Sequence, residues 1–120
     1  MAGRGGHNRS HQGDPELAQF FTPAPVGEFI WLLLESWTGK QLPGVQRAVD
    51  PAAGRGHLLD IAARRLGVGN VYGVEMDSRL AAQRVGLAEH VHFEIGDGLV
   101  DQLPQVAEGG FDLVIGNPPF

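Results

Sequence analysis

Three acidic residues, Asp50, Glu75 and Asp97, each stand at the end of a short apolar run or just after it. If these runs are parallel strands, their carboxyl ends meet at one edge of a sheet, where open α/β folds bind ligands. Carboxylates at such an edge accept hydrogen bonds from hydroxyl and amino groups and attract positive charge. The chemistry expected of this set is therefore the binding of a polar, cationic ligand.

A glycine-rich turn follows the first of these acids, in the segment VDPAAGRGH. Gly54 and Gly56 let the backbone approach a ligand, and a helix that begins near His57 offers free N–H groups. A dinucleotide-binding turn would carry a third glycine where Leu59 stands, and a carboxylate at Asp50 repels phosphate. Taken alone, the turn is equally consistent with a tight strand-to-helix connection.

The second and third acids point to a nucleoside. Glu75 has the spacing at which doubly wound folds present an acid to ribose hydroxyls, and Met76 could pack on an adenine face. Asp97, between two glycines, could accept from the exocyclic amine. The alternatives with no binding role are that Glu75 is an acid favoured at a helix N-terminus and that Asp97 belongs to a common Gly-Asp-Gly turn. Together with Asp50, the set favours S-adenosylmethionine over a nicotinamide dinucleotide.

The sequence ends on FDLVIGNPPF, in which an apolar run is followed by Gly116 and the tetrapeptide Asn117-Pro118-Pro119-Phe120. If the run is a strand, the tetrapeptide lies in the loop at its carboxyl end, where α/β sheets place reactive groups. The alternatives are a reactive-site motif and a simple turn in which Phe120 covers the core.

The elements that must position these residues alternate along the chain. Apolar runs predict strands at residues 45–49, 71–74, 91–95 and 111–115, and helical spacing predicts helices at 58–66 and 78–87. This alternation indicates an α/β fold with a parallel sheet and right-handed crossovers.

The N-terminal part is predicted to hold a flexible arm at residues 1–13 and a short helix that starts at Asp14. A second helix, capped by Thr22, has an apolar stripe at helical spacing, and Trp31 and Trp37 are expected to be core residues. Residues 38–44 read as a loop. The stripe comprises Val26, Phe29, Ile30, Leu33, Leu34 and Trp37.

Composition excludes several classes of function for this segment. It has 120 residues, 42% of them hydrophobic, and no cysteine, so a thiolate zinc site and a thiol nucleophile are ruled out. His90 and His92 have no acid or cysteine at ligand spacing, and we expect no metal. No apolar stretch reaches membrane-spanning length and no signal peptide is visible, which favours the cytoplasm. The net charge of −5 argues against this segment alone binding a polyanion.

These motifs occur in an order that resembles the amino-methylating DNA methyltransferases, specifically the adenine-N6 enzymes of restriction–modification systems. The similar segments are FFTPAPVGEFI, DPAAGRG, GVEMD, GDGL and NPPF, and the match runs from about Gln19 to Phe120. The resemblance implies a Rossmann-like S-adenosylmethionine-dependent methyltransferase fold, with residues 14–120 as the N-terminal part of the catalytic domain. Ala53 departs from a cysteine frequent in the family, and Arg55 is unusual between the glycines.

The resemblance also implies a role for each site residue. Thr22, Asp50, Ala52 and Gly54 would surround the methionine moiety, Glu75 would hold the ribose, and Met76 and Asp97 the adenine. The Asn117 side-chain oxygen and the Pro118 carbonyl would accept the hydrogens of a target amine, and the prolines would hold these acceptors in place. Phe120 would stack on a flipped base, an interaction worth roughly 1–3 kcal/mol.

The expected activity is methyl transfer to adenine N6 in double-stranded DNA, which would be held by a downstream or partner recognition domain. A specificity or restriction subunit is a further expected partner, and a longer parent chain is implied. Two alternatives remain open: a methyltransferase of the same fold that acts on RNA guanine amines or protein glutamine amides, and a non-catalytic nucleoside-binding module.

Overall fold

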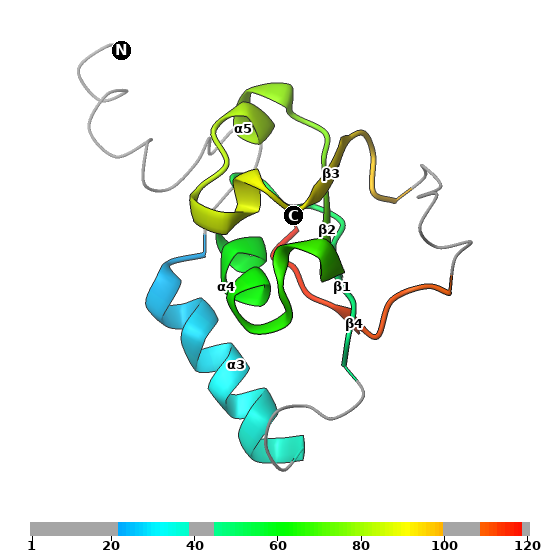
Figure 1. Ribbon diagram of the computed structural model, residues 1–120. Coiled ribbons are helices and arrows are strands. Elements are labelled where there is room, and N and C mark those ends of the chain that lie inside the picture. Colours follow the sequence, from blue (N-terminus) through cyan, green and yellow to red (C-terminus); the bar gives the residue numbers. More distant parts are fainter. Residues whose placement is uncertain (1–21, 39–44, 100–108, 119–120) are drawn as a thin grey trace, which may run out of the picture.

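The computed structural model describes residues 22–38, 45–99 and 109–118, and these residues form a parallel sheet with helices beside it (Figure 1). The predicted arm, the helix at Asp14 and most of the 38–44 loop lie outside the described residues. In chain order the elements are α3 (Ala24–Thr38), β1 (Ala48–Asp50), α4 (His57–Leu66), η2 (Val68–Asn70), β2 (Val71–Glu75), α5 (Ser78–Ala82), η3 (Gly86–Glu89), β3 (His92–Ile95) and β4 (Leu113–Val114).

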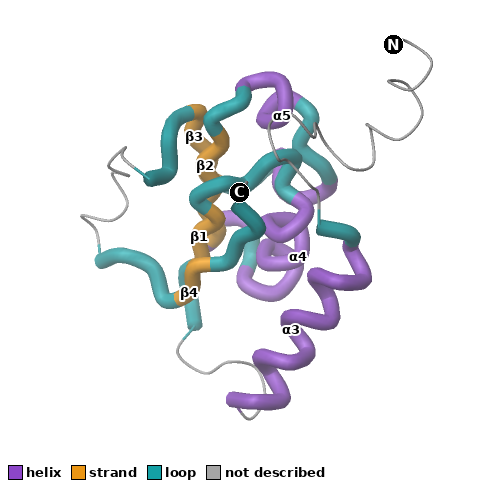
Figure 2. The backbone as a smooth tube through the Cα atoms, turned by 180° about the vertical axis from the view of Figure 1, so that it is seen from behind, coloured by secondary structure: helices purple, strands orange, loops and turns teal. Residues whose placement is uncertain are grey.

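The sheet has the order β3-β2-β1-β4, and every neighbouring pair is parallel. In the register, Val49 lies beside Tyr72 on one side and Val114 on the other, so the carboxyl ends of all four strands meet at one edge. The described helices lie to one side of the strands (Figure 2). The predicted α/β class with a parallel sheet is confirmed.

Helix α4 forms the centre of the core, between the sheet and α3. Its residues Leu59 and Ala62 are fully buried, and Leu59 packs over β2 at Gly73. A side chain at Gly73 would overlap Leu59 and Phe93, so the glycine allows the helix to lie directly on the strand. This packing fixes the start of α4, and with it the glycine-rich turn, against the ends of β1 and β2.

Helix α3 docks on α4 through a face that the periodicity did not predict. Gly27 lies against Ile61 and Leu58, and Trp31 is 1% exposed. Arg65 of α4 pairs with acids of α3, at 3.0 Å from Glu28 Oε2 and 3.2 Å from Glu35 Oε1, and stacks over the Trp31 ring. These contacts fix the start of α3, which begins directly after Thr22 and Pro23.

The expectation that Trp37 is a core residue is wrong, because its side chain is 86% exposed. Val26, Phe29 and Leu33 of the predicted stripe are exposed as well. The reason is that α3 is apolar around most of its circumference, so the period did not determine which side faces α4. The close approach at Gly27 determines it instead.

Several predicted boundaries were also wrong. The helix predicted at 78–87 ends at Ala82, since the chain then turns back and the Val85 N–H donates to the carbonyl of Arg55. The strands predicted at 45–49 and 111–115 are shorter, at Ala48–Asp50 and Leu113–Val114. At their start, the Asp112 carboxylate accepts the N–H groups of Gln46 and Arg47 in place of ladder bonds, which lowers the pKa of Asp112.

Gly56, at the N-cap of α4, is a glycine whose replacement should cost considerable stability. Its φ is +82°, and a methyl group there would lie 2.5 Å from the Cβ of Ala88. We expect Gly56→Ala to lower the free energy of unfolding by about 2–4 kcal/mol, from the left-handed conformation and the overpacking together. Urea denaturation of the wild type and the variant measures this loss in the free energy of unfolding.

The matched control is Gly69→Ala, because a methyl group added to Gly69, in η2, would meet no atom within 4 Å, and Gly69 has no positive φ. We expect this control to change the unfolding free energy by less than about 0.5 kcal/mol. Equal losses in the two variants would contradict the account of Gly56.

No helix in the described ranges has the length and apolar character needed to span a membrane.

Candidate functional site

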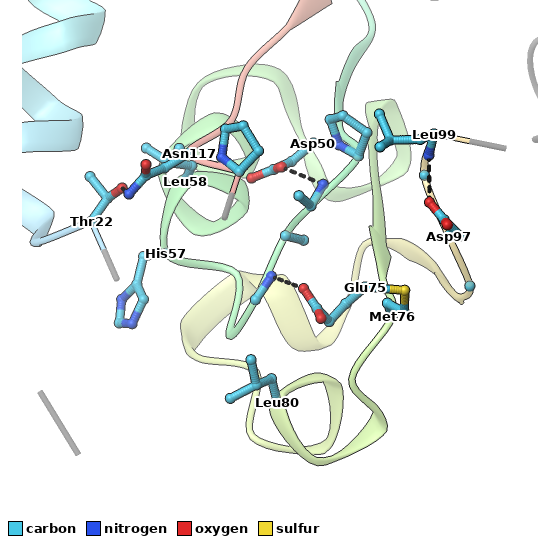
Figure 3. A pocket seen from close by; sticks show the side chains of 17 residues that line it. Thr22, Asp50, His57, Leu58, Glu75, Met76, Leu80, Asp97, Leu99 and Asn117 are labelled. Atoms are coloured by element: carbon cyan, nitrogen blue, oxygen red, sulfur yellow. Dashed lines mark hydrogen bonds between the residues drawn. The ribbon is translucent and has the colours of Figure 1, made fainter. Parts of the chain in front are cut away.

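A cavity of about 270 Å³ opens at the edge of the sheet where the carboxyl ends of the strands meet (Figure 3). Its walls come from the residues before α3, the glycine-rich turn, the ends of β2 and β3, and the loop after β4. The structure brings nine of the predicted site residues together here: Thr22, Asp50, Ala52, Gly54, Glu75, Met76, Asp97, Asn117 and Pro118. Phe120, the tenth, lies outside the described residues.

Asp50 is a buried carboxyl group, 2% exposed, at the end of β1. Its Oδ1 accepts from the Ala52 N–H at 3.0 Å, which closes the turn after the strand. Burial raises the pKa of Asp50 to about 7, opposed by the Ala52 hydrogen bond and assisted by the negative charge of Glu75. A buried carboxylate of this kind is stabilised by a positive charge placed in the cavity.

Glu75 is 7% exposed and accepts backbone hydrogen bonds with both carboxylate oxygens. Oε1 accepts from the Gly54 N–H and Oε2 from the Asp77 N–H, each at 2.7 Å. Glu75 therefore joins the glycine-rich turn to the end of β2. Each oxygen has a second lone pair, so the carboxylate can still accept from ligand hydroxyl groups.

Asp97 follows β3 in a turn that packs on the glycine-rich segment. Its Oδ1 accepts from the Leu99 N–H at 2.9 Å, as in the turn that the sequence suggested. A side chain at Gly98 would overlap the carbonyl oxygen of Pro51, so only glycine allows these two loops to touch. Met76, at 67% exposure, leaves an apolar surface beside this turn open to a ligand.

The loop after β4 lies directly against Asp50. The Ile115 N–H donates to the Val49 carbonyl at 2.9 Å, and a Cβ at Gly116 would lie 3.0 Å from Asp50 Oδ1. One residue further, Asn117 Nδ2 donates to Thr22 Oγ1 at 3.3 Å. The segment before α3 and the loop after β4, 95 residues apart, are thus joined at the cavity.

Sequence reasoning missed several lining residues. His57, the first residue of α4, and Leu58, Leu80 and Leu99 line the cavity (Figure 3). Burial and then the charge of Arg55 lower the pKa of His57, which keeps its ring neutral near pH 7. A signal for His57 was present, because the residue after a glycine-rich turn stands at the open end of the following helix.

Arg55, which had no role from sequence, links the glycine-rich turn to the segment after α5. Its Nε donates to the Gln83 carbonyl at 3.4 Å, and its own carbonyl accepts from the Val85 N–H at 2.9 Å. Two other arginines, Arg65 and Arg84, pack over the rings of Trp31 and Phe93.

Comparison with known proteins finds methyltransferases. No family model matches the chain. The sequence is 34% identical over 85 residues to ribosomal protein L11 methyltransferase of Ralstonia pickettii, covering 71% of this chain and 27% of that protein. It is 35% identical over 81 residues to the protein of the same name in Neisseria gonorrhoeae, covering 68% and 26%. The chain thus spans about a quarter of the length of these curated relatives.

A solved structure supports the same fold. The methyltransferase subunit of a type I restriction–modification system from Streptococcus thermophilus matches with a TM-score of 0.60 at 23% identity, over 84% of this chain and 23% of that one. With the parallel sheet and its flanking helices, this likeness confirms the Rossmann-like methyltransferase fold. The similar proteins do not single out the adenine-N6 type.

Proposed function

We propose that this chain is the cofactor-binding part of an S-adenosylmethionine-dependent methyltransferase that acts on the exocyclic N6 amine of adenine in DNA. The observation that carries the proposal is the convergence of five separate sequence segments on one cavity. The fold and the similar methyltransferases support methyl transfer as the reaction class.

The lining of the cavity fits S-adenosylmethionine better than a phosphate-bearing nucleotide. Asp50 and Glu75 are buried acids at its inner wall, and a carboxylate there favours the cationic methionine moiety. Glu75 retains acceptor capacity for ribose hydroxyls, and Asp97 and the exposed Met76 flank space for a purine. The bound cofactor would supply an electrophilic methyl group.

The residues of the loop after β4 would prepare the amine that receives this methyl group. An adenine amine is a weak nucleophile, because its lone pair is delocalised into the ring. The Asn117 side-chain oxygen and the Pro118 carbonyl, accepting its two hydrogens, favour a tetrahedral nitrogen with a localised lone pair. They also stabilise the positive charge that develops on the nitrogen, so they bind the transition state better than the ground state. Phe120 would stack on the flipped base.

DNA is proposed to be held mainly by other parts of the protein or by a partner. The net charge of this segment is −5, which does not favour binding to a polyanion. The structural neighbour is described as a subunit of a restriction–modification system. A specificity or restriction subunit is accordingly the partner we propose, in the cytoplasm, where DNA and the cofactor are present.

A second candidate function is methylation of a protein. Both curated relatives are named for a ribosomal protein, and an amide or amine of a protein side chain could meet the same acceptors. The tetrapeptide NPPF does not separate the two candidates, and it is the Thr22-Pro23 segment before the glycine-rich turn, with Asp50-Pro51 within that turn, that favours DNA adenine.

Methyl-transfer assays on a panel of substrates test the proposal. The natural polypeptide that contains this segment would be given labelled S-adenosylmethionine with adenine-containing duplex DNA, the same duplex fully N6-methylated, RNA, and ribosomal protein. We expect label in the unmethylated duplex and none in its premethylated counterpart. Label in the protein alone or in the RNA alone would change the assigned substrate to that molecule. If S-adenosylmethionine binds but no methyl group is transferred to any substrate, a non-catalytic module is favoured.

A further inference from the structure

Thr22 and Asn117 form a contact whose consequence goes beyond binding of the cofactor. Their side chains lie next to each other at one side of the cavity (Figure 3), with Asn117 Nδ2 donating to Thr22 Oγ1 at 3.3 Å. Both residues line the cavity. From this geometry we infer that Thr22 is a positioning residue, which orients the Asn117 amide so that its oxygen faces the target amine. The inference rests on the proposed function.

The chemistry of an amide makes its orientation decisive. One end of the Asn117 side chain is an acceptor oxygen and the other is an NH2 donor, and the two ends have nearly the same shape. An amine substrate needs the oxygen, since a flipped amide would present donor hydrogens to donor hydrogens. A hydroxyl that donates its proton to another group, such as the methionine moiety, can only accept from the amide, so it holds the NH2 end on its own side and directs the oxygen end away from Thr22.

The positions of the two backbones are set independently of this bond. Asn117 is held by β4, where the Ile115 N–H donates to the Val49 carbonyl, and by the approach of Gly116 to Asp50. Pro118 biases Asn117 to an extended conformation. These backbone contacts do not set the rotation of the Asn117 side chain, and the bond to the Thr22 hydroxyl restricts that rotation.

On the other side, Thr22 is held by the docking of α3. Gly27 packs against Ile61, Trp31 is buried, and Arg65 pairs with Glu28. The α3–α4 interface therefore brings the hydroxyl to the loop after β4. This assigns the segment before α3 a part in preparing the acceptor, in addition to the methionine contact that the family resemblance implies. The two roles are compatible, because a hydroxyl can accept from one group and donate to another.

The first test is kinetic and compares Thr22→Val, which removes the hydroxyl at constant shape, with Thr22→Ser, which keeps it. We expect Thr22→Val to lower kcat, measured at saturating S-adenosylmethionine, about 10- to 100-fold, in addition to any rise in the Kd for the cofactor from the lost methionine contact. Thr22→Ser should recover kcat to within about threefold. A rise in Kd with an unchanged kcat at saturating cofactor would overturn the inference and leave Thr22 as a cofactor contact only.

The second test does not depend on catalysis. In 15N-labelled protein, the side-chain NH2 resonances of Asn117 should shift in Thr22→Val and stay near their wild-type position in Thr22→Ser. Unchanged resonances in Thr22→Val would overturn the inference whatever the activity. If the wild-type protein transfers methyl to no substrate, the proposed function fails, and the positioning role of Thr22 fails with it. A shift of the Asn117 resonances in Thr22→Val would still show that the two side chains are in contact.

Discussion

Replacing Asn117 by alanine should lower the rate of methyl transfer about 100- to 1000-fold, the loss typical when one preorganised group that stabilises transition-state charge is removed. The physical reason is that the variant lacks the acceptor oxygen that localises the lone pair of the amine. Cofactor binding should stay within about threefold, because the buried acids of the cavity are untouched. Single-turnover kinetics on duplex DNA, with calorimetry for the cofactor, measure the two quantities.

Asn117→Asp separates the acceptor from the amide. A carboxylate also accepts hydrogen bonds, so we expect this variant to retain more activity than Asn117→Ala, although it loses the NH2 group that contacts Thr22. The matched surface control is Asn70→Ala, since the Asn70 side chain donates to the Leu66 carbonyl, and Asn70 is not among the residues that line the cavity. Methyl transfer that survives Asn117→Ala would refute the proposed mechanism.

Replacing Asp50 by asparagine should weaken the binding of S-adenosylmethionine at least about 100-fold, because it removes a buried charge opposite a cation. The same change should stabilise the protein at pH 8. The pKa of Asp50 is raised from 3.8 to about 7, so ionising it in the folded state costs roughly 4 kcal/mol at most. Asparagine avoids this cost and can still accept from the Ala52 N–H.

The pH dependence follows from the same shift. Because the folded pKa lies above the unfolded value, the stability contribution of Asp50 is complete below pH 3.8 and is lost as the pH rises to about 7. A cationic ligand prefers the ionised carboxylate, so affinity should increase with pH up to about 7. At pH 6, binding should release a proton from Asp50.

Calorimetry at pH 6 in two buffers of different ionisation enthalpy measures the proton release, and thermal unfolding at pH 5 and pH 8 measures the stability. Asp112→Asn is the matched control, since Asp112 accepts from Gln46 and Arg47 and is not among the residues that line the cavity. This control should bind the cofactor as wild type does. Proton release that persists in Asp50→Asn would contradict the assignment.

How far the sequence predicts this structure depends on the kind of signal. Asp50 and Glu75 could be placed at strand ends because apolar runs and glycines mark a strand and its turn locally. The exposed face of α3 could not be predicted, because the sequence of an apolar helix does not indicate which side packs on its neighbour. The contact between Gly27 and Ile61 determines that side. The end of α5 depends on a bond between Val85 and Arg55, a contact between segments that no local pattern encodes.

The site itself was predictable as a set of residues, but not as a set of contacts. The spacing of the motifs indicated which residues would meet, and the structure gathers the nine that it describes at one cavity, while their roles stay predictions. The bond between Asn117 and Thr22 and the two bonds that Glu75 accepts could not be read from the chain. Such bonds depend on the sub-ångström geometry of packed backbones, which residue spacing does not carry.

Glu75 has one consequence for anyone who would engineer or evolve this protein. The carboxylate proposed to grip the ribose also ties Gly54 to Asp77, so one side chain serves architecture and recognition at once. In a library of variants, position 75 would be depleted by selection for expression before any selection for activity began. Variants with new cofactor preferences are therefore better sought at Met76, whose side chain is exposed beside Glu75 and is not needed to hold the turn.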